Sequence, residues 1–356
     1  MTAPSDWPIE AELFAELEQS VGNITFTPKS DVIFSYHPFF DPDIRVAKLN
    51  ADRQSASPFP NTDWNTPKTD MDLFLDSVLG LRCDGNGVVW MMDMGLRNDL
   101  TPKLVGWNTN TDSLERIYYV PMPATSPSSQ HNDFTIDEKR RQIIIADEGV
   151  GRDGDGTEAA LVVIDMETGA TRRILQGHES CLPAEVSVVV DGRELTVDGQ
   201  NGKEPLRIGA DGIVADLDFE WLYFGPLSGG WIYRVRLDDI ANTSLTNSEL
   251  GERVEKYAEK PNNGGLGMDR DGNLYLTAVE TNAVGIIPAE TRKYTAYAAH
   301  DDIVWPDGVS FAPDGYMYVS AAQVSEAAIF NDGDARNQAP YRIFRFHPLA
   351  PGRLGY

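Results

Sequence analysis

The sequence has little cysteine, a deficit of positive charge and no long apolar run. Only two of its 356 residues are cysteines, Cys83 and Cys181, so the fold does not rest on a disulfide framework. Lysine and arginine number 30 against 55 aspartates and glutamates, and the net charge of −25 argues against nucleic acid or an anionic membrane as a partner. No segment approaches the roughly 18 consecutive apolar residues of a membrane-spanning helix.

The beginning of the chain also lacks the pattern of a secretory signal. Residues 1–6 contain no basic group and start no apolar run, so we expect no signal peptide and a cytoplasmic location. Several catalytic motifs are missing as well: there is no Gly-x-Ser-x-Gly elbow, phosphate loop, dinucleotide fingerprint or Cys/His zinc spacing. Nucleophilic catalysis and redox-cofactor chemistry are therefore not expected.

What the sequence does contain is one strand pattern that occurs six times. In each copy a short apolar strand leads through a tight turn, often Asp-Gly or Pro-Asp-Gly, into a second apolar or aromatic strand. The second strands are 32–34, 89–91, 143–145, 222–224, 274–276 and 317–319. A repeat of about 50 residues made of short strands is typical of a β-propeller, whose small sheets pack around a central channel. We therefore predict an all-β, six-bladed β-propeller with its site at the axis.

The predicted domain organisation is simple. Residues 1–20 form an N-terminal helical extension, and residues 21–356 form a single propeller domain. Within the extension, the apolar residues of 8–19 fall on one face of a helix, so we predict a short amphipathic helix there. These residues are Ile9, Leu13, Phe14 and Leu17. The repeat does not indicate which end of the chain supplies the strand that closes the ring.

The longest interval between two blades is residues 178–211, between the third and the fourth. It holds two alternating runs, 185–190 and 194–197, which are joined at Asp191-Gly192. Alternation around a two-residue turn of this type predicts an inserted β-hairpin.

Candidate site residues follow from propeller geometry, because the inner strands begin and the second strands end at the same mouth of the channel. The first set comprises His131, Asn132, Asn262, Asn263, Trp305 and Asp307. The second set comprises His37, Asp93, Asp147, Glu148, Glu280, Asn282 and Gln323. Asp93 and Asp147 recur at one repeat position, which favours a structural role in a turn.

Four segments resemble the Yellow / major royal jelly protein family. The first comprises residues 81–95 and 102–107, the second comprises residues 211–213 and 222–227, and the others are residues 280–285 and 305–308. The resemblance runs in order over about residues 20–348. It implies a six-bladed propeller with a small-molecule site at the axis. Some insect members are dopachrome-converting isomerases, others bind biogenic amines, and others are secreted storage or signalling proteins. Those insect proteins are secreted and disulfide-bonded, and we expect this chain to differ from them in both properties.

A more distant likeness is to the gluconolactonase and regucalcin propellers. That likeness implies a divalent metal, Ca²⁺ or another, held four residues before the central apolar residue of each inner strand. Asp307 and Asn132 match this rule. Gly22 stands where that family carries Glu, Leu79 and Gly264 occupy two further positions, and the register of the fourth blade stays ambiguous. The predicted ligand set is therefore incomplete, and we expect no required cofactor.

The function predicted from these residues is acid–base isomerisation or tautomerisation of an aromatic, quinonoid or enolisable metabolite. Asp307 and His131 are the predicted catalytic pair, one as base and the other as acid. The side-chain amides of Asn132 and Asn263 would hydrogen-bond the developing oxyanion. The predicted substrate-binding residues are Asn132, Asn263, His37, Glu280, Asn282 and Trp305.

Two other functions remain open at this point. One is a metal-dependent lactone hydrolase in which Asp307 and Asn132 hold the cation. The other is a propeller that binds a small ligand without catalysis. In each case the expected partner is a small molecule, with neither nucleic acid nor membrane involved.

Overall fold

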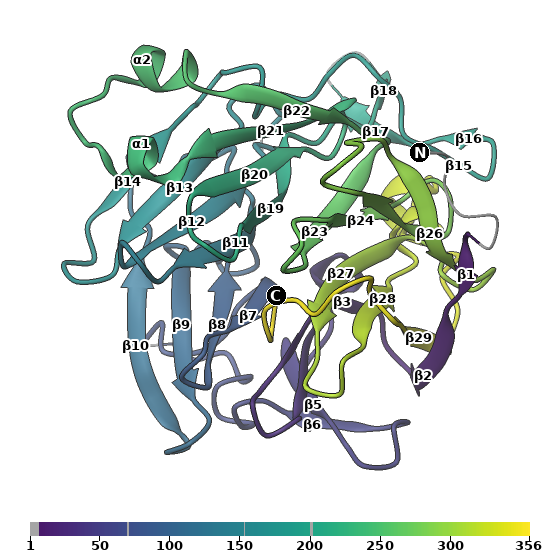
Figure 1. Ribbon diagram of the computed structural model, residues 1–356. Helices are drawn as coiled ribbons and strands as arrows, with labels where there is room; N and C mark the ends of the chain where they lie inside the picture. The colour runs from purple at the N-terminus through teal and green to yellow at the C-terminus, as the bar shows by residue number, and fades with distance from the viewer. Residues whose placement is uncertain (1–6, 70, 153, 200–201) are drawn as a thin grey trace.

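Six antiparallel sheets are arranged around one axis, as Figure 1 shows for the computed structural model of the chain. The structure describes residues 7–69, 71–152, 154–199 and 202–356. Each sheet is one propeller blade of four main strands. All six second strands predicted from the repeat are second strands of a blade, so the predicted six-bladed propeller is confirmed.

The first three blades follow the chain in order from the axis outward. Blade 1 comprises β3 (Val21–Phe26), β4 (Val32–Tyr36), β5 (Val46–Leu49) and β6 (Ala56–Pro58). Blade 2 comprises β7 (Val78–Cys83), β8 (Val88–Asp93), β9 (Lys103–Asn108) and β10 (Ser113–Tyr119). Blade 3 comprises β11 (His131–Asp137), β12 (Gln142–Asp147), β13 (Ala160–Asp165) and β14 (Thr171–Ile174).

The last three blades complete the ring. Blade 4 comprises β19 (Ala210–Ala215), β20 (Trp221–Pro226), β21 (Trp231–Arg236) and β22 (Glu255–Glu259). Blade 5 comprises β23 (Asn263–Met268), β24 (Leu274–Ala278), β25 (Ala283–Ile287) and β26 (Thr295–Ala299). Blade 6 comprises β27 (Pro306–Phe311), β28 (Met317–Ala321), β29 (Tyr341–Phe346) and β2 (Glu12–Leu17).

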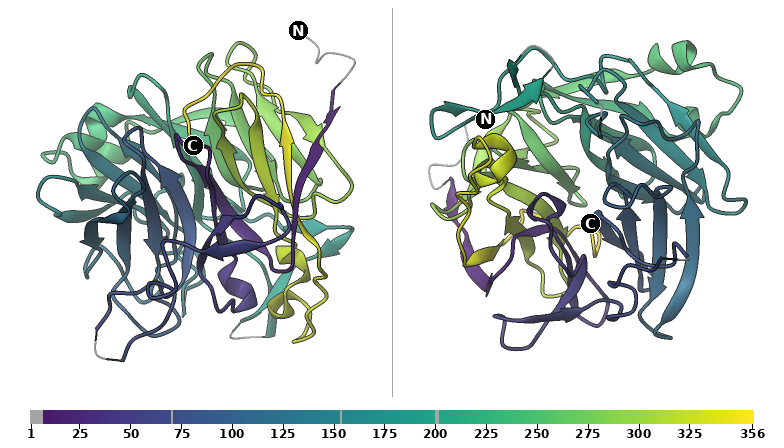
Figure 2. Two further views of the ribbon diagram at one scale, coloured as in Figure 1. Left: turned by 90° about the horizontal axis from the view of Figure 1, so that it is seen from below. Right: turned by 180° about the vertical axis from the view of Figure 1, so that it is seen from behind.

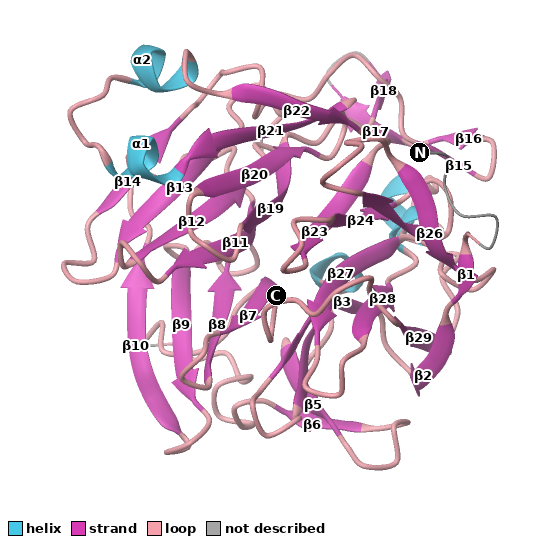
Figure 3. Ribbon diagram, in the orientation of Figure 1, coloured by secondary structure: helices cyan, strands magenta, loops and turns pink. Residues whose placement is uncertain are grey.

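Helices are few and short, as Figure 3 shows. The α-helices are α1 (Leu237–Ala241) and α2 (Asn247–Gly251), and the 3₁₀ turns are η1 (Pro38–Phe40), η2 (Val324–Glu326) and η3 (Ala328–Phe330). Within the described ranges, no helix is long and apolar enough to cross a membrane.

The core lies between neighbouring blades. One apolar cluster joins blades 3 and 4, and another joins blades 5 and 6. Two aromatic residues of the second strands, Tyr275 and Tyr318, are at most 1% exposed. Each blade therefore buries apolar side chains against its neighbours in the ring.

The predicted N-terminal helix is wrong, because this segment forms strands. β1 (Ile9–Glu10) pairs in parallel with β26, and β2 is the outer strand of blade 6, antiparallel to β29. The N-terminal strand therefore closes the ring, which the repeat alone did not decide. A β-bulge between Leu13 and Ala15 changes the face that the strand presents. Leu13 and Leu17 are four residues apart, as two residues on one face of a helix would be. Leu13 is nevertheless 50% exposed, whereas Leu17 is 2% exposed.

The insertion between blades 3 and 4 contains two short hairpins in place of the single predicted one. β15 (Val189–Val190) pairs with β16 (Arg193–Glu194) across the turn at Asp191-Gly192. The following run does not extend this pair. It forms β17 (Thr196–Gly199), which pairs with β18 (Gly202–Pro205).

The closing strand gives a test of the fold. Replacing buried Leu17 by Ala removes apolar contacts of blade 6 and should lower the free energy of unfolding by about 2–4 kcal/mol. Leu13→Ala on the same strand is the matched control, and it should change that free energy by less than about 0.5 kcal/mol because Leu13 is exposed. Equal losses in denaturant titrations of the two variants would contradict the strand and support a helix with both leucines on its buried face.

Candidate functional site

All six inner strands carry a β-bulge at the same place, near the mouth of the channel. In each bulge two residues are left unpaired between the inner and the second strand. A bulge turns side chains out of the regular alternation of a strand, and here it directs them toward the axis. The first residues of the six bulges are Gly22, Leu79, Asn132, Asp211, Gly264 and Asp307.

Asn132 connects two carboxyl groups at this level of the channel. Its Nδ2 donates to Oε1 of Glu148 at 2.6 Å and to Oδ1 of Asp211 at 2.9 Å. Gln130 donates its side-chain amide to the other oxygen of Glu148. Glu148 and Asp211 are 3% and 4% exposed, so two acids of neighbouring blades lie almost out of contact with solvent.

A buried ion pair lies beside this group. Arg82 donates from its guanidinium to Oδ2 of Asp133 at 3.3 Å and to Oδ1 of Asn23 at 3.3 Å. Asn23 in turn donates its amide to the other oxygen of Asp133. Burial raises the pKa of Asp133, and the adjacent Arg82 acts in the opposite direction.

Asp307 faces His37 across the start of blade 6. Oδ2 of Asp307 lies 3.9 Å from Nε2 of His37, which is beyond hydrogen-bonding distance. The backbone N–H of Phe39 donates to Nδ1 of His37 at 3.2 Å, so the neutral ring carries its proton on Nε2, on the side of Asp307. Burial lowers the pKa of His37 to about 3 and raises the pKa of Asp307 to about 7. The pair is therefore neutral when Asp307 is protonated.

Oδ2 of Asp307 is a buried oxygen with no hydrogen-bond partner among the described residues. The Asp307 side chain as a whole is 16% exposed, so the carboxyl is reached from one side only. A buried acceptor without a partner is costly, and it marks a position where a bound molecule would gain a hydrogen bond.

The absence of a side chain at Gly264 leaves a space lined by oxygens. A Cβ built on Gly264 would lie 3.2 Å from Oγ1 of Thr277, 3.7 Å from Oδ1 of Asp307 and 3.9 Å from Oδ2 of Asp211. Oγ1 of Thr277 is also buried without a hydrogen-bond partner in the described part of the chain. Three oxygens from blades 4, 5 and 6 thus surround one point near the axis.

The carboxyl groups at the axis raise one another's pKa values. Burial raises the pKa of Glu148 to about 8, and the charges of Asp147 and Asp307 act in the same direction. Burial and the charges of Glu148, Asp133 and Asp307 raise the pKa of Asp211 well above its ordinary value. Acids this close cannot all ionise in a medium of low polarity, so the cluster holds protons near neutral pH.

The two ends of the channel differ in character. At the mouth an apolar cluster packs residues of the insertion against Trp305, Val324 and Phe330 of blade 6. At the opposite end the last residues of the chain enter the ring, and the C-terminus lies at its centre in Figure 1 and in the right view of Figure 2. There the backbone of Tyr356 accepts from the N–H of Phe311 at 2.8 Å.

The structure brings three of the predicted site residues together at the axis: Asp307, Asn132 and His37. Asn263 lies close by, but its amide donates to the backbone carbonyl of Gly264 at 2.8 Å. Trp305 is 3% exposed and packs in the apolar cluster at the mouth.

His131 takes part in a different buried group. Its Nε2 lies 3.1 Å from Oγ1 of Thr125, and its Nδ1 lies 3.7 Å from Oδ2 of Asp147. Arg173 donates to the same Asp147 oxygen at 2.5 Å. The charged neighbours of His131 are thus Asp147 and Arg173, whereas the histidine beside Asp307 is His37.

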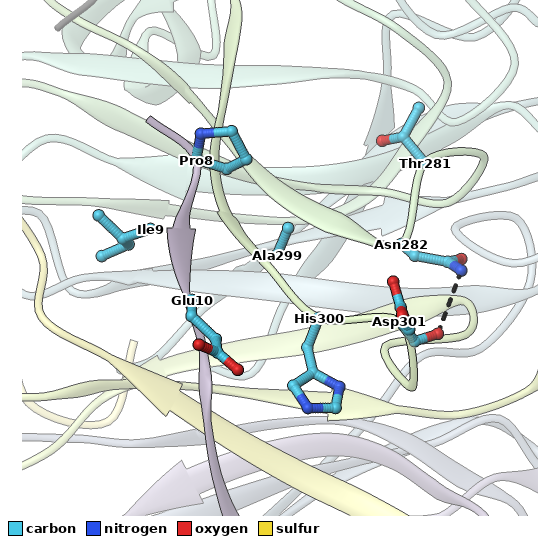
Figure 4. Close-up of a pocket in the computed structure, with 8 residues that line it drawn as sticks. All are labelled: Pro8, Ile9, Glu10, Thr281, Asn282, Ala299, His300 and Asp301. Atoms are coloured by element: carbon cyan, nitrogen blue, oxygen red, sulfur yellow. Dashed lines mark hydrogen bonds between the residues drawn. The ribbon is translucent and has the colours of Figure 1, made fainter. Parts of the chain in front are cut away.

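Glu280 and Asn282 contact the periphery of the mouth. Oε1 of Glu280 accepts from the backbone N–H of Val189 at 2.6 Å and so holds the first hairpin of the insertion. Asn282 lines a surface pocket, shown in Figure 4, together with Thr281 and His300 of blade 5 and with residues of β1. A second surface pocket lies between blades 4 and 5. We place the candidate site at the axis because the buried acids with shifted pKa values converge there.

Sequence reasoning missed Asp211 and Arg82 and gave Glu148 no role. One signal for Asp211 was present, because Asp211-Gly212 precedes Ile213 as Asp307-Gly308 precedes Val309. Arg82 had no such signal, since nothing in its sequence context distinguishes an arginine that points into the channel from one that points to solvent.

The residues present do not form a complete metal centre. Oxygen ligands suit a hard cation such as Ca²⁺, which takes about six to eight of them. In the described part of the chain, however, no three His, Cys, Asp or Glu side chains come together closely enough to hold an ion. Gly22 leaves the first-blade position without a ligand, and the Asn132 amide is engaged through its nitrogen.

The pKa of Asp307 predicts a pH dependence of stability. Its ordinary value is 3.8 and its value in the folded chain is about 7, so the folded state binds the proton more tightly than the unfolded state. The free energy of unfolding should therefore fall as the pH rises from about 4 to about 7. In Asp307→Asn, the decrease in the free energy of unfolding between pH 4 and pH 7 should be smaller than in the wild type by roughly 2–4 kcal/mol. The measurement is denaturant titration in chelator-containing buffers.

The exposed Asp218, whose side chain forms no hydrogen bond or ion pair among the described residues, provides the control. Asp218→Asn should retain the wild-type pH dependence. If Asp307→Asn also kept the wild-type slope between pH 4 and 7, the shifted pKa of Asp307 would be wrong.

Solved structures share the fold of this chain at low sequence identity. A candidate gluconolactonase from a structural genomics consortium superposes with a TM-score of 0.60, at 13% identity, over 99% of both chains. A gluconolactonase from Xanthomonas campestris gives 0.56 at 9% identity over 95% of both. A calcium-binding regucalcin from Agrobacterium tumefaciens gives 0.55 at 12% identity over 97% of this chain and 98% of the other. At these identities the likeness concerns the fold alone.

No curated protein matches the chain in a sequence search. A family model does match: that of the major royal jelly proteins, over residues 76–344. The matched range covers most of the chain, from blade 2 to the third strand of blade 6. The chain therefore belongs to the major royal jelly protein family.

Proposed function

We propose that the chain is a small-molecule isomerase or tautomerase whose substrate binds at the channel axis beside Asp307. The observation that supports this is the group of buried acids with pKa values near neutrality, with Asp307 at about 7 and Glu148 at about 8. A group with such a pKa can both accept and donate a proton at physiological pH. An isomerisation needs both steps and leaves the atoms of the substrate unchanged in number.

In the proposed reaction Asp307 takes a proton from a carbon or heteroatom of the substrate. Its Oδ2, which lacks a hydrogen-bond partner among the described residues, is the atom for this step. The electron pair left behind moves toward an oxygen of the substrate. A proton is then returned at a second position by protonated Glu148 or Asp211, and the acid that gave it is restored by proton exchange with Asp307. The net change is the shift of one proton and one double bond.

His37 is the proposed partner of Asp307 in place of His131. The neutral ring directs its Nε2–H toward Asp307, so it can donate to the carboxylate or to a developing oxyanion near it. Its low pKa keeps it neutral, which makes it a hydrogen-bond donor and not a general acid. Asn132 is the proposed positioning residue, since it fixes Glu148 and Asp211 relative to each other.

The activity is tested by deuterium incorporation. The protein is incubated in D₂O with a panel of quinones, aromatic amines and enolisable ketones, and products are followed by mass spectrometry. Asp307→Asn should lower the turnover of any converted compound by about 100-fold or more, the usual contribution of a general base. Conversion by Asp307→Asn at the wild-type rate would overturn the role of this residue.

Two histidines provide a matched comparison for the proposed pair. His37→Gln should lower kcat by about tenfold or more, because the donor beside Asp307 is displaced. His131→Gln should leave kcat within about threefold and lower the thermal midpoint, because it disturbs a buried hydrogen-bonded group away from Asp307. A larger loss of kcat in His131→Gln than in His37→Gln would instead support His131 as the partner of Asp307. Tight binding of a panel compound without conversion would instead identify a binding protein.

A lactone hydrolase is the second candidate, favoured by the oxygen-lined space at Gly264 and by the fold that the chain shares with gluconolactonases. There Asp307 would take a proton from water as the water attacks the carbonyl carbon. The ring C–O bond would break, and the leaving oxygen would gain a proton.

Elemental analysis separates the two candidates. We expect purified, unchelated protein to contain well under one equivalent of calcium, magnesium, manganese or zinc, and isomerase activity to survive treatment with EDTA. The hydrolase would be supported, and the isomerase contradicted, by two results together. These are about one metal ion per chain that is lost in Asp307→Ala, and lactone hydrolysis that EDTA abolishes.

A further inference from the structure

A surface pocket between blades 4 and 5 differs from the rest of this acidic protein in its charge. It lies on the outer part of the ring, where β21 and β22 run along the top of Figure 1. Its lining residues are Trp231, Tyr257, Ala258, Glu259, Lys260, Arg292, Lys293 and Tyr294. Three cations and three aromatic rings thus meet with a single acid, although the chain as a whole has a net charge of −25.

Two of these cations have no acidic partner within the described residues. Arg292 and Lys293 are exposed and take part in no ion pair there. By contrast, Arg234 and Lys256, which lie on the neighbouring strands, pair with Glu255 at 2.7 Å and with Glu179 at 3.2 Å. The positive charge at the rim of the pocket is therefore free to act on a ligand.

The third cation, Lys260, forms part of the pocket wall, but its charged group is not available to a ligand. Its ammonium donates to the carbonyl oxygens of Pro226 at 2.8 Å and Gly229 at 2.7 Å. It also donates to the carbonyls of Leu227 and Pro261. Since these carbonyls use the donors of the ammonium, a ligand would meet the methylene stem of Lys260.

The aromatic rings give the pocket an apolar wall next to the free cations. Tyr257 is 8% exposed and packs edge-on against Tyr223, with ring centroids 4.9 Å apart. The Arg292 guanidinium lies 4.6 Å from the centre of the Tyr257 ring, where cation–π attraction holds it beside the pocket. Arg292 also has a φ of 51°, a backbone conformation that is unfavourable for a residue with a side chain. The cation is thus held at the rim by a strained turn.

We propose that this pocket binds a planar aromatic anion, a ring that carries a carboxylate. The ring would lie against Trp231 and Tyr294, which line the pocket and are partly exposed, and the carboxylate would meet Arg292 and Lys293. A guanidinium recognises a carboxylate with two parallel hydrogen bonds, and an adjacent lysine adds a point charge. The site is separate from the axis, so the proposal does not depend on the function of the channel.

Isothermal titration calorimetry with 1-naphthoate tests the proposal, with 1-naphthalenemethanol as its uncharged counterpart. The naphthoate should bind with a Kd of roughly 10 μM to 1 mM, at least tenfold more tightly than the alcohol. Raising NaCl from about 0.05 to 0.5 M should weaken naphthoate binding several-fold, because the cations are exposed. Equal affinity for acid and alcohol, or no binding of naphthoate up to several millimolar, would overturn the proposal.

Variants then locate the bound molecule. The double variant Arg292→Ala/Lys293→Ala should lose at least tenfold in affinity for naphthoate, and its thermal midpoint should stay near that of the wild type because both residues are exposed. Arg270→Ala is the matched control: Arg270 is likewise exposed and without an ion pair among the described side chains, and its replacement should leave the affinity unchanged. An equal loss in both variants would indicate a general charge effect and contradict the assigned pocket.

Discussion

The site depends on the energetic cost of burying several carboxyl groups next to one another. Asp133, Glu148 and Asp211 are almost fully buried at the axis, and Asp307 adds a fourth acid at its edge. An isolated carboxylate is very costly in such a place. The chain offsets the cost in two ways: Asp133 is paired with Arg82, and all four acids have raised pKa values. The proposed chemistry uses the raised pKa values, because an acid that is protonated at neutral pH can donate its proton to a substrate.

The propeller makes this concentration of acids possible by repeating one backbone feature six times. The bulge at the start of each inner strand presents a side chain to the axis irrespective of its chemistry. Gly264 leaves space beside the carboxyl of Asp307, since a Cβ there would lie 3.7 Å from its Oδ1, whereas the position beside Gly22 is filled by Cδ1 of Leu79. The six blades share one backbone geometry but carry different residues at the bulge, so the site is asymmetric although the ring is nearly symmetric.

Buried charge at the outer part of the mouth has a different role. Asp93 pairs with Lys103 at 2.8 Å, and both side chains are fully buried. Asp147 pairs with Arg173 and accepts from the backbone N–H of Gln130. These acids follow the second strands of blades 2 and 3 and hold the adjoining turns, as the repetition in the sequence predicted. Asp93 and Asp147 thus differ from Glu148, Asp211 and Asp307 in that each forms an ion pair with a nearby cation and stabilises a turn.

The sequence by itself determined the fold, because strand periodicity and turn chemistry are local properties and recur six times. It also predicted that Asp307 and Asn132 lie at the mouth of the channel, since Pro-Asp-Gly and the start of a strand are visible in a linear chain. Tertiary structure alone decided the rest. The bulge in β2 makes a strand resemble a helix in its apolar spacing, so only pairing with β29 showed that the N-terminal segment closes the ring. Likewise His37 and His131 both lie at the mouth in sequence terms, but only packing shows that His37 faces Asp307 while His131 faces Asp147. Contacts between blades join residues far apart in the chain, and no local pattern encodes which side chains meet there.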